Sequence, residues 1–408
     1  MTNTETLPEQ NYGLPAFLYI ASIGLERAGY YGLRAILILY MMSDILYMDQ
    51  GVALSIYSIL ATVIVFTQIL GGVVGDLILG NRNTAFLGGV IQAIGAFVLC
   101  IPSVVTLYIG VGLISLGSGL YSPNVLANFG KLHAGRERKM DSGYTLFYTS
   151  LNLGAFLGVL LIGALANINF MFGFLASGIL ILAGAVLLIL VQTKSLEKLT
   201  IKSKNTLSNQ AILVIIAIIL SSLFWGVYEL GGSFKYFALQ DLIGELDSSL
   251  SFGLLEGISN SFLIIVGVIG VIVWWFSYVN RFIKLGIGFI AGALAFVLFL
   301  LLPETGAFSR LAIFLVSVLL LGIAEIGIAP TINSIIATNT NSKYLAIVFS
   351  VVFLPVRLLY YLNSLFAQYN YDRPLLGVTI GCILLFVVGA VILVGYFVIK
   401  NNSKPSVT

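Results

Sequence analysis

Charged side chains, histidine and cysteine are all scarce in this chain, and each shortage excludes a class of protein. Charged residues make up 9% of the 408 residues, whereas a soluble domain carries about 25%. Hydrophobic residues make up 59% and the mean hydropathy is +1.06, which is the composition of an integral membrane protein. Cys100 and Cys382 lie inside apolar runs, which predicts small packing residues and no disulfide framework.

The scarcity of histidine also limits the chemistry. The only histidine, His133, lies in a basic loop, and the sequence contains no metal-ligating cluster, nucleotide-binding loop or nucleophile–base arrangement. We therefore expect no metal, no cofactor, no enzymatic activity and no nucleic-acid partner.

Apolar segments long enough to cross a bilayer recur along the chain. A bilayer core of ~30 Å requires ~20 apolar residues in a helix. About twelve such segments are centred near residues 28, 66, 94, 115, 155, 180, 220, 264, 291, 320, 354 and 386. The sequence therefore predicts an all-α integral membrane protein, with one six-helix bundle at residues 1–192, a polar linker at 193–208 and a second six-helix bundle at 209–408.

The basic residues predict the orientation of these spans. Most of the 20 lysines and arginines fall on one side of the membrane when the spans are counted alternately, and only Lys235, Arg310 and Arg373 fall on the other. By the positive-inside rule, both termini and the linker lie in the cytoplasm, in an inner or plasma membrane. Two six-span halves with a cytoplasmic linker are typical of major facilitator transporters, whose substrate site lies between the halves. An ion channel or a polytopic membrane enzyme has a similar span count.

The first apolar segment, Leu14 to Met42, carries three charges at Glu26, Arg27 and Arg34. Each costs roughly 2.5–3.5 kcal/mol at the centre of a membrane helix, so intramembrane charges usually mark a substrate or ion pathway. With Tyr30 and Tyr31 they fall within a sector of roughly 140° on one helix. This pattern predicts a helix that lines a cavity and backs onto lipid; the alternative is a structural ion pair between neighbouring helices.

Carboxylates are also predicted inside the second half, at Glu229, Glu256 and Glu325. An isolated buried carboxyl group favours its protonated form. Since the spans hold no histidine, these groups are the predicted proton carriers near neutral pH.

Six short motifs occur in order along the chain. They are Glu26-Arg27-Ala28-Gly29-Tyr30-Tyr31-Gly32 with Arg34 just beyond; Gly71 to Gly80 around Asp76, followed by Arg82; Gly119 to Asn124; Phe147 to Gly154; Phe224-Trp225, Tyr228-Glu229 and Gly232-Ser233; and Glu325 followed by Pro330. In these motifs, from about Gly13 to Arg357, the chain resembles the proton-dependent oligopeptide transporter (POT/PTR) family of the major facilitator superfamily. The resemblance implies the major facilitator fold and proton-coupled import of di- and tripeptides.

The resemblance also implies roles for individual residues. Arg34 would hold the carboxylate of a peptide and pair with Glu229 as an outer gate. Glu325 would meet the amino group of the peptide, with Asn260 close to it.

Other positions follow from the same resemblance. Tyr30 and Tyr31 would line the pocket, Trp225 would contact substrate, and Glu26 would be a protonation site close to Arg27. Tyr148 and Asn152 share a helix face that suits a polar ligand; core packing is the alternative for the aromatic residue.

Four further residues are predicted to be structural. Asp76 and Arg82, in a glycine-rich turn, suggest a cytoplasmic latch, with a plain structural turn as the alternative. Pro123 and Pro330 free backbone carbonyls in mid-membrane, which is tolerated beside a wet cavity or neighbouring groups.

The chain departs from the family pattern at two positions. Ile23 replaces the leading glutamate of the first-helix signature, and Ser122 replaces the fourth-helix lysine. Arg357 is additional, and it either compensates by pairing with Glu325 or Glu256, binds an anionic substrate group, or snorkels to the cytoplasmic surface.

The sequence therefore predicts a monomeric secondary transporter that imports small peptides with protons across the bilayer by alternating access. A second hypothesis is a divergent relative that carries another zwitterionic or anionic metabolite, with altered or lost proton coupling. A third is a non-transporting receptor or assembly component on the same scaffold.

Overall fold

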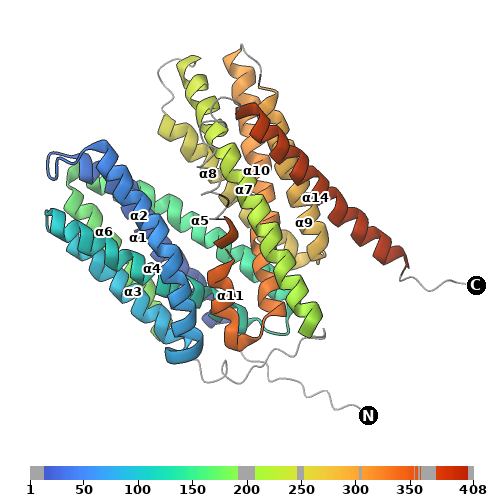
Figure 1. The fold of residues 1–408 in the computed structure, drawn as a ribbon, viewed down its shortest axis with the longest axis horizontal. Helices are drawn as coiled ribbons and strands as arrows, with labels where there is room; N and C mark the ends of the chain where they lie inside the picture. Colours follow the sequence, from blue (N-terminus) through green and yellow to red (C-terminus); the bar gives the residue numbers. More distant parts are fainter. Residues whose placement is uncertain are drawn as a thin grey trace, which may run out of the picture.

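The computed structural model describes residues 13–191, 207–245, 252–302, 306–352, 354–356, 359 and 374–402. Over these residues the chain forms twelve α-helices and no strand (Figure 1). Each segment predicted from hydropathy is centred on a helical residue, so the predicted all-α architecture and its count are confirmed.

Six helices form the first part of the chain. They are α1 (Gly13–Met42), α2 (Gln50–Val74), which continues as the π-helical turn η1 (Gly75–Leu79), α3 (Asn81–Val98), α4 (Val104–Leu132), α5 (Glu137–Ile168) and α6 (Phe170–Ile189). Three begin with side-chain caps, because Asp49, Ser103 and Asn169 each accept a hydrogen bond from the backbone two residues later. Gly80 separates η1 from α3 with φ +79°, a conformation that favours glycine.

The second part contains α7 (Leu207–Glu245), α8 (Phe252–Phe276), α9 (Arg281–Leu300), α10 (Ala307–Asn339), the short 3-10 helix η2 (Ser342–Tyr344), α11 (Leu345–Val351) and α14 (Pro374–Asn402). Asn280 caps α9 by accepting a hydrogen bond from the backbone of Phe282. Pro123 in α4 and Pro330 in α10 lie inside continuous helices, and both are buried among neighbouring helices.

Eight helices of the described chain are long and apolar enough to cross a membrane. The apolar parts of α8 and α11 are shorter, α1 carries the three charges, and α3 begins with Asn81, Arg82 and Asn83. The protein is thus a multi-pass membrane protein. The less apolar helices include those that carry the polar groups described below.

The helices pack mainly within the two parts of the chain. In the first part α1 packs against α5 and α6, and α4 against α2 and α3; in the second α9 packs against α10 and α14, and α7 against α10. Contacts between the parts run from α5 to α8 and α10, and from α2 and α4 to α11 (Figure 1). An aromatic cluster strengthens one of these junctions, since Phe129 of α4 stacks on Tyr144 of α5, which contacts Phe349 of α11.

Glycines set the closest approach between α1 and α5. A Cβ atom at Gly154 would overlap the carbonyl oxygen of Gly24, and one at Gly158 would overlap that of Ala28. Only glycine therefore fits at these two positions of α5, and the two helix backbones lie in direct contact.

Candidate functional site

Two arginines and two tyrosines of α1 form the centre of the site. The Arg27 guanidinium lies 5.5 Å from the ring centroid of Tyr30 and 5.9 Å from that of Tyr31. Arg34 lies 5.6 Å and 5.9 Å from the same two rings. The rings thus stand between two cations within cation–π range, and the predicted polar sector of α1 is formed.

Arg34 has a partner on the neighbouring helix. Its Nη2 donates to the hydroxyl of Tyr57 in α2 at 2.7 Å, and the guanidinium lies 4.9 Å from the centroid of that ring. Its Nε is buried and has no hydrogen-bond partner in the described chain. A buried guanidinium with an unused donor is suited to an anionic group such as a carboxylate.

Glu26 is fully buried and faces α3. Its Oε1 accepts a hydrogen bond from Gln92 at 2.9 Å, and its Oε2 lies 3.2 Å from Nε of Arg27. Arg27 in turn donates from Nη2 to the hydroxyl of Ser122 in α4 at 2.5 Å. Glu26 and Arg27 thus form an ion pair by distance, and Gln92 is a partner that the sequence did not reveal.

The hydrogen bonds of this network are incomplete. Glu26 Oε2, Arg27 Nε and Gln92 Oε1 are buried without a hydrogen-bond partner among the described residues, although the first two form an ion pair by distance. Buried polar atoms are usually satisfied, so the surroundings of Glu26 are less completely paired than is typical.

A hydrogen bond crosses between the two parts of the chain at the same site. The Tyr148 hydroxyl of α5 donates to Oε1 of Glu325 in α10 at 2.5 Å. Tyr31 of α1 and Tyr228 of α7 lie in the neighbourhood of Tyr148. The amide of Asn152 donates to the Tyr148 carbonyl at 2.9 Å, so its nitrogen is used within its own helix.

Trp225 and Glu229 both lie on α7. Trp225 packs against Tyr228 with ring centroids 5.2 Å apart. Glu229 is exposed and lines an apolar cavity of about 400 Å³ together with Gly226 and Pro355. The structure does not bring Arg34 and Glu229 into contact: the arginine is paired with Tyr57 instead.

Three sequence predictions lie partly or wholly outside the described residues. The backbones of Glu256 and Asn260 lie in α8, but their side chains are not described, and Arg357 falls in the gap at residues 357–358.

The predicted latch residues both form contacts between helices. Asp76 accepts hydrogen bonds from Asn81 at 2.9 Å and from the backbone N–H of Ile347 in α11 at 2.8 Å, so it joins the two parts of the chain. Lys131 lies 3.7 Å from Asp76. Arg82 donates to the carbonyls of Leu188 and Ile189 at the end of α6, and hence binds within the first part.

A cluster of charged and polar residues around Asp141 in α5 was not predicted from the sequence. This carboxylate, 3% exposed, accepts from Nε of Arg281 and Nζ of Lys284, each at 2.8 Å, and from the hydroxyl of Ser334 at 2.5 Å. Arg281 and Lys284 are among the basic residues that the positive-inside rule assigns to the cytoplasmic side. In the sequence, the cluster is indicated only by an acidic residue among the basic residues at the start of α5. Its partners lie more than a hundred residues away.

The two departures from the family pattern occupy different surroundings. Ile23 is 2% exposed and belongs to the hydrophobic core. Ser122 accepts the hydrogen bond from Arg27. Neither position therefore holds a charge, and the Arg27 side chain reaches the α4 position from α1.

The chain is similar in sequence to known families and proteins. The family model of the Major Facilitator Superfamily matches residues 19–356. The chain is 35% identical over 210 residues to the uncharacterized transporter YclF of Bacillus subtilis (strain 168), a match that covers 48% of this chain and 43% of that relative. It is 32% identical over 157 residues to a di-/tripeptide transporter of Lactococcus lactis subsp. lactis (strain IL1403), covering 36% and 32% of the two chains. The matched regions thus span less than half of the relatives' lengths.

Solved structures share the fold over almost the whole chain. The peptide transporter POT in complex with sulfate superposes with a TM-score of 0.61 at 20% identity, covering 93% of both chains. A POT family transporter in complex with 5-aminolevulinic acid gives a TM-score of 0.61 at 22% identity, covering 93% of this chain and 95% of the other.

Proposed function

The chain belongs to the Major Facilitator Superfamily, and from this premise we propose that it is a secondary transporter that imports small peptides together with protons by alternating access. It would act as a monomer in the inner or plasma membrane, with both termini in the cytoplasm. The motif resemblance and the similarity to a di-/tripeptide transporter support the peptide as the first candidate cargo.

One observation carries the proposal: tyrosines lie beside a cationic group in the first part of the chain, and another tyrosine of that part bonds to an anionic group of the second part. Arg34 and Tyr31 stand on α1, and Tyr148 donates from α5 to Glu325 on α10. A zwitterionic solute offers a carboxylate and an ammonium group, which complement Arg34 and Glu325. Tyr30, Asn152, Trp225 and Asn260 are proposed to complete the binding surface.

Binding of the ammonium group would replace the Tyr148–Glu325 hydrogen bond. The carboxylate would then exchange a neutral hydroxyl partner for a cation, which strengthens its interaction. Substrate binding would thus break the Tyr148–Glu325 hydrogen bond between the two parts of the chain. A stronger bond between Glu325 and the substrate would form in its place.

Proton coupling is proposed to involve Glu26. Its carboxylate is buried, has one ion-pair partner in Arg27 and is surrounded by incompletely satisfied polar atoms. Protonation would release Arg27, which already contacts Ser122, to interact elsewhere. Glu325, Glu229 and Arg357 are the other proposed members of the coupling path.

The contacts between the parts support an arrangement that is closed on the predicted cytoplasmic side. Asp76 binds α11 and Asp141 binds α9 and α10, all at helix ends that the positive-inside rule assigns to the cytoplasm. Arg34 and Glu229 are apart, as expected when the outer gate is open. Rocking of residues 1–192 against 209–408 would break the first contacts and form the Arg34–Glu229 pair.

A related cargo is the second candidate. A POT family transporter of the same fold holds 5-aminolevulinic acid, which has one amino and one carboxyl group and no peptide bond. The absence of charge at Ile23 and Ser122 favours a changed pocket or changed coupling in this chain.

The test is uptake of labelled dialanine into proteoliposomes, with and without an inward proton gradient. Accumulation driven by the gradient supports the proposal, equilibration without accumulation identifies a facilitator, and no uptake by the folded protein rejects peptides. Competition by 5-aminolevulinic acid then ranks the two cargoes. Glu325→Gln should abolish accumulation or lower affinity at least about tenfold, a loss of ~1.4 kcal/mol; unchanged function in that variant would favour a receptor.

A further inference from the structure

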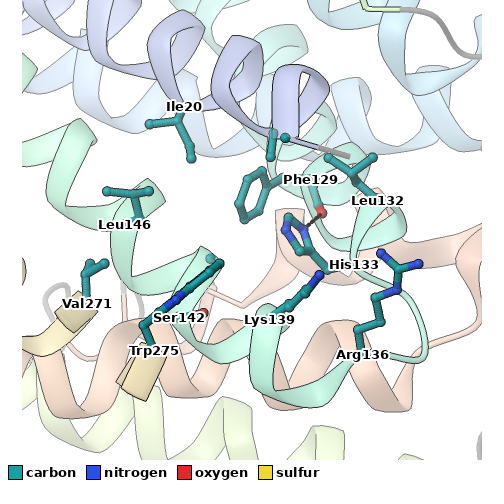
Figure 2. A pocket seen from close by; sticks show the side chains of 13 residues that line it. Ile20, Phe129, Leu132, His133, Arg136, Lys139, Ser142, Leu146, Val271 and Trp275 are labelled. Carbon is teal, nitrogen blue, oxygen red and sulfur yellow. Dashed lines mark hydrogen bonds between the residues drawn. The ribbon is translucent and has the colours of Figure 1, made fainter. Parts of the chain in front are cut away.

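A second cavity lies away from the central site, where the cytoplasmic ends of α1, α4, α5 and α8 meet (Figure 2). It has a volume of about 670 Å³. Its lining comes from both parts of the chain, and the proposed transport cycle assigns it no role.

The cavity has a basic end and a mainly apolar end. Figure 2 shows His133, Arg136 and Lys139 near one another, with the apolar Leu132 beside them, and the side chains of Ile20 and Leu146 across the cavity. Lys139 is exposed and has no ion pair or hydrogen bond in the described chain. The basic end is therefore able to receive an anion, and its charges lie on the side of the membrane where anionic lipids attract basic residues.

The apolar end has exposed side chains. Leu146 of α5 is 40% exposed and Trp275 of α8 is 55% exposed, and both line the cavity. Above Trp275, α8 exposes Ile265, Val268, Ile269 and Ile272, a spacing of three and four residues that forms one continuous apolar face. An acyl chain leaving the cavity would follow this face, with Trp275 at the level of the head groups, where tryptophan is enriched.

The histidine adds a polar contact. Its Nδ1 lies 3.0 Å from the carbonyl oxygen of Phe129, which only accepts hydrogen bonds, so Nδ1 carries the proton. Nε2 of neutral His133 is then an acceptor. It lies beside Gly143, where an added Cβ would come within 3.3 Å of it. A head-group hydroxyl is the complementary donor.

From this combination of cationic rim, apolar groove and lipid-facing tryptophan, we propose that the cavity binds an anionic glycerophospholipid of the cytoplasmic leaflet. Its phosphate would lie between Arg136 and Lys139, a head-group hydroxyl would donate to His133, and one acyl chain would run between α5 and α8. The bound lipid would contact both parts of the chain, in the arrangement seen here. The proposal does not depend on the transported solute.

Quenching of tryptophan fluorescence tests this site, because the chain has only three tryptophans and one of them lines the cavity. The protein is placed in phosphatidylcholine nanodiscs containing graded fractions of phosphatidylglycerol with brominated acyl chains, and compared with brominated phosphatidylcholine at the same fractions. We expect saturable quenching at low phosphatidylglycerol fractions, and its loss in Trp275→Phe. Quenching that depends on bromine content alone, whatever the head group, would overturn the proposal.

Matched variants identify the binding groups. Arg136→Gln with Lys139→Gln should raise the phosphatidylglycerol fraction for half-quenching by roughly tenfold or more, since each basic residue near the surface contributes substantially to anionic-lipid attraction. Lys343→Gln with Lys400→Gln removes the same charge from predicted cytoplasmic positions outside the cavity and should leave the half-point unchanged. Equal shifts in both double variants would mean attraction by general surface charge and reject the site.

A last comparison separates a lipid from a free anion. Unbrominated phosphatidylglycerol should relieve the quenching, whereas inorganic phosphate in excess should not. Relief by inorganic phosphate would reassign the cavity to a soluble anion and overturn the lipid proposal.

Discussion

Two buried carboxylates, Asp141 and Glu26, have contrasting surroundings. Asp141 receives hydrogen bonds from an arginine, a lysine and a serine of α9 and α10. Glu26 receives one from a neutral glutamine and lies 3.2 Å from one arginine. A fully paired buried charge is rigid and expensive to disrupt, whereas a half-paired one exchanges partners at lower cost. The first arrangement suits a closed contact, and the second suits proton transfer.

The largest expected effect is that of Asp141→Asn. The substitution keeps the shape but leaves Arg281 and Lys284 near the interface without an anion, which costs about 3–5 kcal/mol in comparable buried pairs. Thermal unfolding in detergent should show a strong decrease in melting temperature. Asp44→Asn, at an exposed position, is the matched control. Equal melting temperatures of the two variants would show that Asp141 is not a strongly stabilising carboxylate.

Glu26→Gln should cost less stability and more function. The amide still accepts from Gln92, and Arg27 keeps Ser122 and the tyrosine faces, so we expect a loss of about 1.5–3 kcal/mol, the range for a hydrogen bond to a charged group. Gradient-driven accumulation should disappear while equilibration of substrate persists. Accumulation at the wild-type level would remove Glu26 from the proton path.

Arg34→Lys tests the substrate side of the central site. The lysine keeps the charge but cannot form two parallel hydrogen bonds to a carboxylate, so KM should rise roughly tenfold. The melting temperature should change little, since the partners of Arg34 are the neutral hydroxyl of Tyr57 and tyrosine rings, which a lysine can also contact. An unchanged KM measured by dialanine uptake would show that the carboxylate binds elsewhere.

The smallest effect concerns the pH dependence of stability at His133. Burial lowers the pKa of His133 below its usual 6.5; the Phe129 carbonyl opposes this and the charges of Arg136 and Lys139 add to it. Between the two pKa values the unfolded chain binds more protons than the folded one. The stabilisation is therefore complete above pH 6.5 and declines as the pH falls toward the folded pKa. Melting temperatures between pH 7.5 and 5.5 should fall less in His133→Gln than in the wild type.

The architecture could be predicted from sequence because hydropathy is a local property. Twenty apolar residues in a row specify a helix wherever they lie, and the segment near residue 28 was identifiable despite its charges. The relation between Glu26 and Arg27 was also predictable, because the residues are adjacent. Their further partners, Gln92 and Ser122, come from other helices and depend on how those helices pack.

The same limit explains the missed cluster. Asp141 lies in a basic region, where an acidic residue suggests only a local surface pair. Its partners Lys284 and Ser334 are brought to it by packing of α5 against α10 and the neighbouring start of α9. The expected pair of Arg34 and Glu229 could not be tested from sequence for a different reason. A transporter has more than one conformation, and the sequence does not specify which of them a structure shows.

The close contact of α1 and α5 has a consequence for the geometry of ligand binding. With glycine at positions 154 and 158, the two backbones interlock at Gly24 and Ala28 and cannot slide along each other. Arg34 on one helix and Tyr148 on the other are therefore held at a constant separation while other helices move. A solute bound to Arg34 would therefore meet Tyr148 at a fixed distance, while its distance to Glu325 on α10 would change as the two parts of the chain move.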